Sequence, residues 1–182
     1  MKKICVFCGA RSGARPTYVA AARAFGRLLA DRGLGLVYGG GRVGLMGELA
    51  QAALDHGGYV TGVIPSFLSQ RELQHPGLHT CHVVTDLMER KAMMMEIADA
   101  FVALPGGIGT LDEVLEVMAW RGLKRVDKPI GFFNVDDFFE PWRTTLGYLD
   151  QEGFVESAEL GKLVYETEPE RLLERLGFGP VR

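Results

Sequence analysis

The chain has 182 residues, of which 47% are hydrophobic and 24% are charged, with a formal net charge of −3. This length favours a single domain covering residues 1–182, and the composition is typical of a soluble globular protein. The slight negative charge argues against binding to a nucleic-acid polymer or an anionic membrane surface. No apolar run approaches the ~20 residues of a membrane span.

The beginning of the chain and its cysteines favour the cytoplasm. Residues 1–4 lead directly into a strand-like run and lack the apolar core of a signal peptide. Three cysteines cannot all pair, which fits a reducing compartment. Cys5 and Cys8 form a C-x-x-C motif, so a redox dithiol is an alternative. In an extended segment, however, residues three apart face opposite sides, and we expect two buried small side chains instead.

In the first half of the chain, short apolar segments alternate with helical patterns. A helix is expected to begin near Pro16, which suits a first turn, and its apolar residues recur at helical spacing until Gly33 ends it. A second helix is expected over residues 45–56. The expected strands of this half cover residues 4–8, 34–38, 59–64 and 81–84. Residues 65–79 form a long polar connection marked by Gly and Pro.

The second half continues the alternation. We expect helices from Thr85 or Asp86 to about residue 98 and from the turn at residues 105–109 to about residue 123. The remaining strands are expected at residues 101–104, 129–133 and 163–165, and the remaining helices at residues 138–152 and 169–176. Strands that are apolar throughout and alternate with helices indicate a parallel sheet with helices on both faces. We therefore predict a doubly wound, Rossmann-like α/β fold, which binds ligands at the carboxyl ends of its strands.

A first glycine cluster, residues 39–44, follows the second expected strand and formally matches the G-x-G-x-x-G dinucleotide motif. The acid that should bind a ribose about 20 residues later is missing, because residues 60–65 contain no Asp or Glu. A tight turn that only packs a strand against a helix is one alternative. Since a second glycine turn follows in the same sheet, we favour a shared nucleotide or sugar-phosphate pocket.

The second glycine cluster, residues 105–109, lies between an expected strand and an expected helix. Its glycines allow close approach of a ligand, and the free N–H groups of the new helix favour an anion such as phosphate. Glu113 then brings a carboxylate next to the phosphate site. Thr110 and Glu113 also match a capping box, in which Glu113 would only fold back onto the helix start. The sequence leaves both interpretations open.

The helix before this cluster carries Arg90 and Lys91. Asp86 and Glu89 offer a second capping arrangement, so a structural role is expected for Glu89. The rest of the helix is mostly apolar, so an inward-facing Arg90 needs an anionic partner, either a carboxylate or a phosphate. The four histidines, His56, His75, His79 and His82, show no ligand arrangement, and we expect no metal and no cofactor.

These motifs together resemble the LOG ("Lonely guy") family, long mislabelled as lysine decarboxylases. The chain reads Y-G-G-G-R-V-G-L-M-G at residues 38–47, R-K at residues 90–91 and P-G-G-I-G-T-L-D-E at residues 105–113. Family members often have Met-His before the E-R-K segment, and here Leu87-Met88 stand in its place. This departure leaves the preferred base open.

The resemblance implies hydrolysis of the N-glycosidic bond of cytokinin riboside 5′-monophosphates, and of AMP, to free base and ribose 5-phosphate. By motif position, the catalytic residues are Arg90 and Glu113. The substrate-binding residues by the same correspondence are Gly40, Gly41, Gly44, Met46, Arg90, Lys91, Gly106, Gly107, Gly109, Thr110 and Glu113. Family members also assemble as dimers, so we expect a homodimer.

Three other functions compete with this one. The first is a carrier or sensor that binds a nucleotide or pterin-type cofactor without catalysis. The pairing of Glu113 with Arg90 argues against a pure carrier. The second is an NAD-dependent dehydrogenase, which the missing ribose acid disfavours. The third is a pyridoxal-phosphate lysine decarboxylase, which is disfavoured because the chain is short and no lysine stands out as a Schiff-base candidate.

Overall fold

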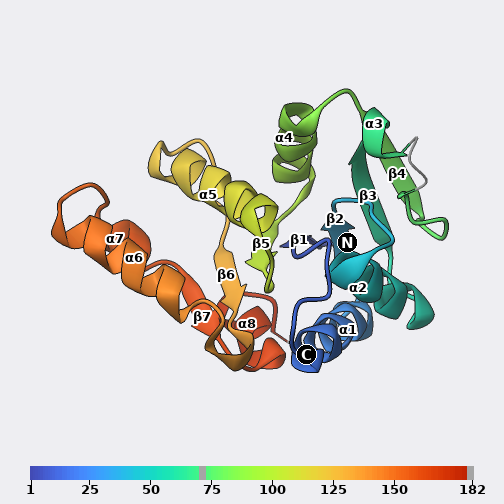
Figure 1. The fold of residues 1–182 in the computed structure, drawn as a ribbon, viewed down its shortest axis with the longest axis horizontal. Helices are drawn as coiled ribbons and strands as arrows, with labels where there is room; N and C mark the ends of the chain where they lie inside the picture. Colours follow the sequence, from blue (N-terminus) through green and yellow to red (C-terminus); the bar gives the residue numbers. More distant parts are fainter. Residues whose placement is uncertain (70–72, 180–182) are drawn as a thin grey trace.

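The computed structural model describes residues 1–69 and 73–179, which form a parallel sheet covered by helices on both faces (Figure 1). The strand order is β4-β3-β2-β1-β5-β6-β7, and every neighbouring pair is parallel. The strands are β1 (Lys3–Phe7), β2 (Gly35–Tyr38), β3 (Val60–Pro65), β4 (Thr80–Val84), β5 (Ala100–Ala103), β6 (Ile130–Phe133) and β7 (Val164–Glu166). The predicted doubly wound fold is confirmed.

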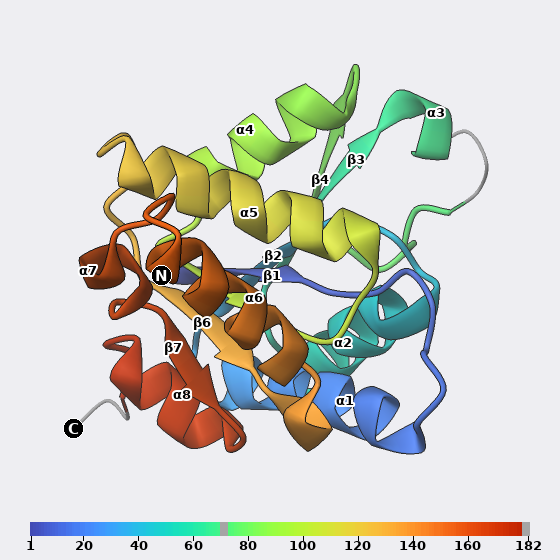
Figure 2. The same cartoon turned by 60° about the vertical axis from the view of Figure 1, so that its left-hand side comes forward.

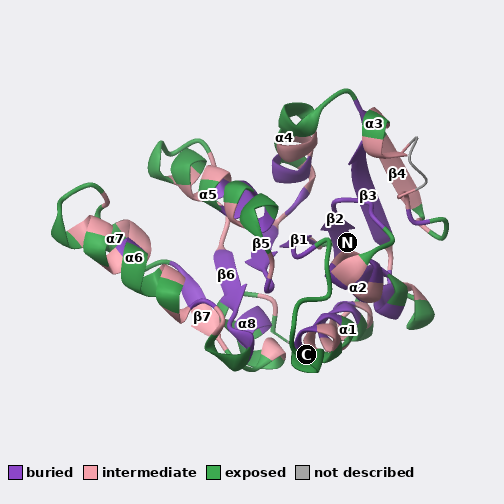
Figure 3. Cartoon of the chain, viewed as in Figure 1, coloured by how far each residue is buried: buried purple, intermediate pink, exposed green. Residues whose placement is uncertain are grey.

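The helices divide between the two faces of the sheet (Figure 2). One face is covered by α1 (Pro16–Asp31), α2 (Gly44–Asp55) and α8 (Pro169–Arg175). The other is covered by α4 (Leu87–Ile97), α5 (Ile108–Gly122) and α6 (Glu140–Gln151). Both faces of β1, β2 and β5 are therefore buried, as Figure 3 shows, which explains why these strands are apolar at every position except the first residue of β1, Lys3.

The two N-terminal cysteines lie in different halves of the core. Cys8 packs with the α1–α2 side of the sheet and Cys5 with the α4–α5 side, and both are free thiols. Burial raises the pKa of both thiols above the ordinary value, so neither is an activated thiolate. The redox alternative is therefore wrong, for the reason of strand geometry.

The structure differs from the predicted elements mainly in short helices. The connection after β3 contains α3 (Ser66–Ser69), and its residues 70–72 lie outside the described residues. A 3-10 turn, η1 (Val135–Asp137), precedes α6 and delays its start to Glu140. The helix α7 (Ser157–Leu160) was not predicted. Four-residue helices are too short to show the periodicity on which such predictions depend. In the described part of the chain, no helix is long and apolar enough to cross a membrane.

Gly44, the first residue of α2, holds the loop after β1 in place. Its φ is +61°, and a Cβ atom there would lie 2.3 Å from the carbonyl carbon of Ala10 and 2.4 Å from the nitrogen of Arg11. The same loop accepts a hydrogen bond from the Met46 N–H on the Gly9 oxygen, at 3.3 Å. Because Gly44 has no side chain, the loop after β1 can pack directly against the start of α2.

The substitution Gly44→Ala is expected to lower the free energy of unfolding by about 2 to 4 kcal/mol, because it adds backbone strain and a clash with the loop. The control is Gly122→Ala, at the end of α5, where a Cβ would meet nothing within 4 Å. That control is expected to change stability by less than about 1 kcal/mol. Urea unfolding of the two variants and the wild type measures both effects. Equal stability of the two variants would contradict the packing role given to Gly44.

Candidate active site

A cavity of about 660 Å³ lies at the carboxyl ends of β1 and β5. The two strands are neighbours, and the chain runs from β1 to β2 on one side and from β5 to β6 on the other. This is the point where the strand order reverses, which is where open α/β sheets bind ligands. The cavity is bounded by the loop after β1, the turn before α5, the start of α2 and one residue of α4.

The turn before α5 leaves the start of that helix open to the cavity. Gly107 is the N-cap in an extended conformation, and no side chain caps the helix. A Cβ at Gly107 or Gly109 would meet nothing within 4 Å, whereas a Cβ at Gly106 would lie 2.1 Å from the Thr110 hydroxyl oxygen. The first N–H groups of α5 thus lack intrahelical partners and border an open space. Such an arrangement favours binding of a phosphate.

The capping-box interpretation of Thr110 and Glu113 is wrong. Because α5 begins at Ile108, Thr110 is its third residue and cannot be the N-cap. Thr110 is buried, and the Glu113 carboxylate accepts a hydrogen bond from Arg90 rather than from the helix start. The predicted capping at the start of α4 is confirmed: the Asp86 carboxylate accepts from the N–H groups of Met88 and Glu89.

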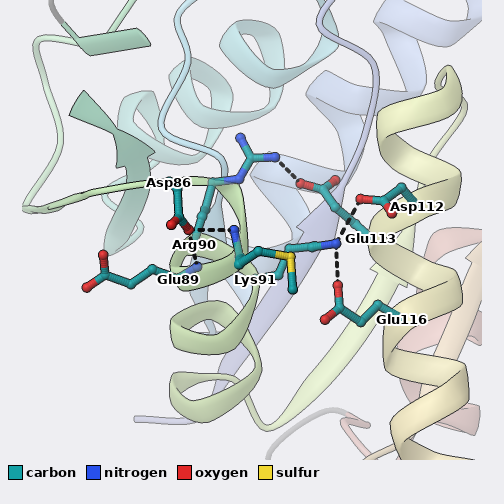
Figure 4. A network of polar contacts seen from close by, with 8 residues as sticks. Asp86, Glu89, Arg90, Lys91, Asp112, Glu113 and Glu116 are labelled. Carbon is teal, nitrogen blue, oxygen red and sulfur yellow. Dashed lines mark hydrogen bonds and ion pairs between the residues drawn. The ribbon is translucent and has the colours of Figure 1, made fainter. Parts of the chain in front are cut away.

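Arg90 of α4 and Glu113 of α5 form a buried ion pair (Figure 4). The Arg90 Nη2 donates to the Glu113 Oε1 at 2.6 Å, and the two side chains are 14% and 9% exposed. The guanidinium lies over Gly39, where a Cβ would be 3.5 Å from Nη1. The Arg90 Nε is buried and has no hydrogen-bond partner among the described residues. The anionic partner that the sequence required of Arg90 is therefore Glu113.

The environment of Glu113 raises its pKa. Burial is the main cause, Asp112 adds to it, and Arg90 opposes it; together they raise the pKa from 4.5 to about 7. A carboxyl group with a pKa near neutrality exists in both protonation states under ordinary conditions. Such a group suits general acid–base catalysis, which works best when the pKa lies near the working pH.

The raised pKa predicts a pH-dependent stability difference between the wild type and Glu113→Gln. Between about pH 4.5 and pH 7 the unfolded chain releases this proton and the folded protein keeps it, so wild-type stability falls as the pH rises. The variant lacks this loss. Relative to the wild type, its free energy of unfolding is expected to gain up to roughly 3 kcal/mol over that range. Urea unfolding at both ends of the range tests this, and a difference that does not change with pH would refute it.

The structure brings many of the predicted site residues to the cavity, but not all. Those that line it are Met46, Arg90, Gly106, Gly107, Gly109, Thr110 and Glu113. Gly40, Gly41 and Gly44 do not line it: a Cβ at Gly41 would meet the lining residue Met46, one at Gly40 would meet Ile64 of β3, and Gly44 supports the loop after β1. Lys91 points away from the cavity toward Asp112 and Glu116 (Figure 4). Within the first glycine cluster, Gly41 and Gly44 are thus next to lining residues, Met46 and the loop after β1.

Several lining residues were not predicted. Arg11 comes from the loop after β1, Tyr18 from α1, Leu68 from α3, and Phe138 from the segment before α6. The rings of Tyr18 and Phe138 meet edge to face with centroids 5.6 Å apart. Arg11 could have been found, because it lies in the loop after the carboxyl end of a central strand. The other three come from distant segments and carry no local signal.

Within residues 1–69 and 73–179, no three His, Cys, Asp or Glu side chains are grouped so that they could hold a metal ion. Three of the four histidines have local partners: the His56 ring bonds the Ala52 carbonyl, His75 accepts from the Gly77 N–H, and His79 stacks on Tyr59. The strand β3 ends at Pro65 without the acid expected of a dinucleotide site.

Comparisons with known proteins agree with this geometry. A family model described as "Possible lysine decarboxylase" matches residues 46–176. A cytokinin riboside 5′-monophosphate phosphoribohydrolase of Rhodococcoides fascians is 46% identical over 164 residues, which cover 90% of this chain and 83% of that protein. An enzyme of the same name from Arabidopsis thaliana is 47% identical over 154 residues, covering 85% and 71%. The molybdenum cofactor carrier protein of Chlamydomonas reinhardtii shares the fold, with a TM-score of 0.71, 19% identity and coverage of 92% and 91%.

Proposed function

The chain belongs to the LOG family of cytokinin riboside 5′-monophosphate phosphoribohydrolases, and we propose that it hydrolyses the N-glycosidic bond of such nucleotides. The products are the free base and ribose 5-phosphate. One observation carries the proposal: the buried Arg90–Glu113 pair and the open start of α5 border the same cavity. A carboxylate beside a phosphate site is what cleavage of a ribose 5-phosphate derivative needs.

In this proposal the start of α5 binds the 5′-phosphate. Gly106, Gly107, Gly109 and Thr110 line that end of the cavity, and the absence of side chains at the glycines lets the phosphate approach the N–H groups. Charge-assisted hydrogen bonds to a phosphate are stronger than those between neutral groups. They supply binding energy remote from the reacting bond, which can be used to position the ribose.

Glu113 then acts on the ribose and the attacking water. Breaking the bond between C1′ and the base nitrogen leaves positive charge on the ribose, which a nearby carboxylate stabilises. The same carboxylate takes a proton from water as the oxygen of that water bonds to C1′. The electron pair of the broken bond leaves with the base, which takes up one proton, so water is the only reagent consumed. Arg90 orients the carboxylate through the 2.6 Å hydrogen bond. Tyr18, Leu68 and Phe138 supply apolar walls for the base.

Three finer proposals follow from the resemblance. AMP is a substrate, because the groups at the start of α5 would contact only the phosphate that AMP shares with its N6-modified derivatives. The chain, residues 1–182, acts as one nucleotide-binding domain in the cytoplasm and needs no nucleic acid or cofactor. It forms a homodimer, for which the exposed side chains of Met88 and Trp120 offer apolar contact surface.

The test is incubation of the wild-type protein with AMP and with isopentenyladenosine 5′-monophosphate, followed by chromatography of the free base and ribose 5-phosphate. We expect equimolar release of both products from at least the isopentenyl nucleotide. Tight nucleotide binding without release from either substrate would favour the carrier function instead.

A further inference from the structure

Lys91 was predicted to bind the substrate, but in the described structure its ammonium forms ion pairs with two carboxylates of α5 outside the cavity. Its side chain is 11% exposed, and its Nζ lies 3.0 Å from the Asp112 Oδ2 and forms a second ion pair with Glu116 (Figure 4). Burial lowers the pKa of Lys91, but the bonds to Glu116 and Asp112 prevail and raise it. The ammonium therefore stays charged and is directed at α5, outside the cavity.

The contacts of Lys91 stand next to those of Arg90. These two adjacent residues of α4 bind three carboxylates of α5. Arg90 binds Glu113, and Lys91 binds Asp112 and Glu116. Asp112 and Glu116 are four residues apart and lie on one side of the helix, one turn from each other. A single ammonium that binds both restricts rotation of α5 about its axis. The direction in which Glu113 points is thereby fixed.

Lys91 also balances the charge around Glu113. The titratable and charged groups that face this region come from both helices and from the first strand and its loop: Asp112 and Glu116 on α5, Arg90 and Lys91 on α4, the thiol of Cys5 in β1, and Cys8 and Arg11 in the loop after β1. Loss of Lys91 would leave three neighbouring carboxylates with Arg90 as their only bonded cation among the described residues. Like charges close together disfavour ionisation of a buried carboxyl group.

From these contacts, and on the premise of the proposed function, we infer that Lys91 is a positioning residue. It holds Asp112 and Glu116, and through them sets the direction and the ionisation of Glu113, without contacting the nucleotide.

The kinetic test compares Lys91→Met, Lys91→Arg and the control Lys128→Met across pH. Lys128 is a matched control because its ammonium also has bonded partners, the carbonyl oxygens of Met95 and Glu96 near the end of α4, but is bonded to none of the three carboxylates of α5. In Lys91→Met we expect the acidic limb of kcat to move up by about one pH unit, which lowers kcat at pH 7 by about fivefold. The KM of Lys91→Met for AMP is expected to stay within about twofold of the wild-type value. Lys91→Arg and Lys128→Met are both expected to keep the wild-type pH profile of kcat.

A fourth variant keeps the test decisive if Lys91→Met does not fold. Asp112 is exposed, and its carboxylate opposes ionisation of Glu113, so Asp112→Asn is expected to move the acidic limb in the opposite direction, to lower pH. An unmoved limb in Lys91→Met together with a tenfold rise in KM would assign Lys91 to the substrate and overturn the inference. An unmoved limb in both Lys91→Met and Asp112→Asn would overturn it as well.

A readout without catalysis separates this inference from the proposed function. Carbon-13 NMR of the glutamate carboxyl groups follows the titration of Glu113, identified as the signal that is missing in Glu113→Gln. The titration midpoint is expected to rise by about one pH unit in Lys91→Met and to keep its wild-type value in Lys128→Met. If the wild type cleaves no nucleotide but this shift is seen, the proposed function fails and the role of Lys91 stands. If the wild type cleaves the nucleotide and the midpoint does not move in Lys91→Met, the proposed function stands and the role of Lys91 is overturned.

Discussion

Replacement of Glu113 by glutamine is expected to reduce base release from nucleoside 5′-monophosphates by about a hundredfold to ten-thousandfold, the range typical for loss of a general base. Glutamine has the same shape and can still accept the hydrogen bond from Arg90, but it cannot take a proton from water. Because the substitution keeps the volume of the side chain, the variant is expected to fold. Base release is measured by chromatography, and folding by circular dichroism.

Glu89→Gln is the matched control for this substitution. Glu89 precedes Arg90 on α4, and its carboxylate accepts from the backbone and hydroxyl groups of Thr85. It has a structural contact and lies outside the cavity, so its removal is expected to leave the turnover rate within about twofold of the wild type. If Glu113→Gln retained near-normal turnover, the role of Glu113 in the reaction would be lost.

The second large effect concerns the 5′-phosphate. Adenosine is expected to have a kcat/KM at least about a thousandfold below that of AMP, since each hydrogen bond to a charged group contributes about 1.5 to 3 kcal/mol and several N–H groups border the cavity at the start of α5. Free adenine released from both compounds under equal conditions gives the ratio. Comparable turnover of adenosine and AMP would show that the start of α5 does not bind the 5′-phosphate during the reaction.

A protein-side variant tests the same contact. Gly109 has open space around its Cβ position, so Gly109→Asp is accommodated without a clash. An aspartate in the first turn of a helix also stabilises the helix. Its negative charge should repel the phosphate and raise KM for AMP at least about tenfold, whereas the neutral control Gly109→Asn should have a much smaller effect. Equal KM values for the two variants would place the phosphate elsewhere.

The sheet and the strand ends could be predicted because burial on both faces makes the central strands almost entirely apolar, and glycines mark the turns. The Arg90–Glu113 pair could be anticipated in part. An arginine on an otherwise apolar helix requires an anion, although the sequence does not say which of several carboxylates provides it. The structure selects Glu113 because α4 and α5 lie side by side on one face of the sheet.

Other features depended on contacts between distant segments. Thr110 and Glu113 match a capping box, but the helix starts two residues before Thr110 because Gly107 takes the N-cap position. Lys91 follows Arg90 in the motif, yet consecutive helical residues point in different directions, and Lys91 meets Asp112 and Glu116. The walls formed by Tyr18 and Phe138 meet only in the folded protein.

The most direct test of hydrolysis at this site is the reaction of the wild type with isopentenyladenosine 5′-monophosphate in water enriched in oxygen-18. We expect one equivalent of free base for each ribose 5-phosphate. Because ring opening slowly exchanges the C1′ oxygen of free ribose 5-phosphate with water, early samples are reduced at once with borohydride, and mass spectrometry should find one heavy oxygen at C1′ of the reduced sugar, above the level of unlabelled ribose 5-phosphate kept in the same water for the same time. Glu113→Gln should give neither product at a comparable rate. Bound nucleotide without base release, or base release without heavy oxygen in the sugar, would contradict hydrolysis by an activated water at Glu113.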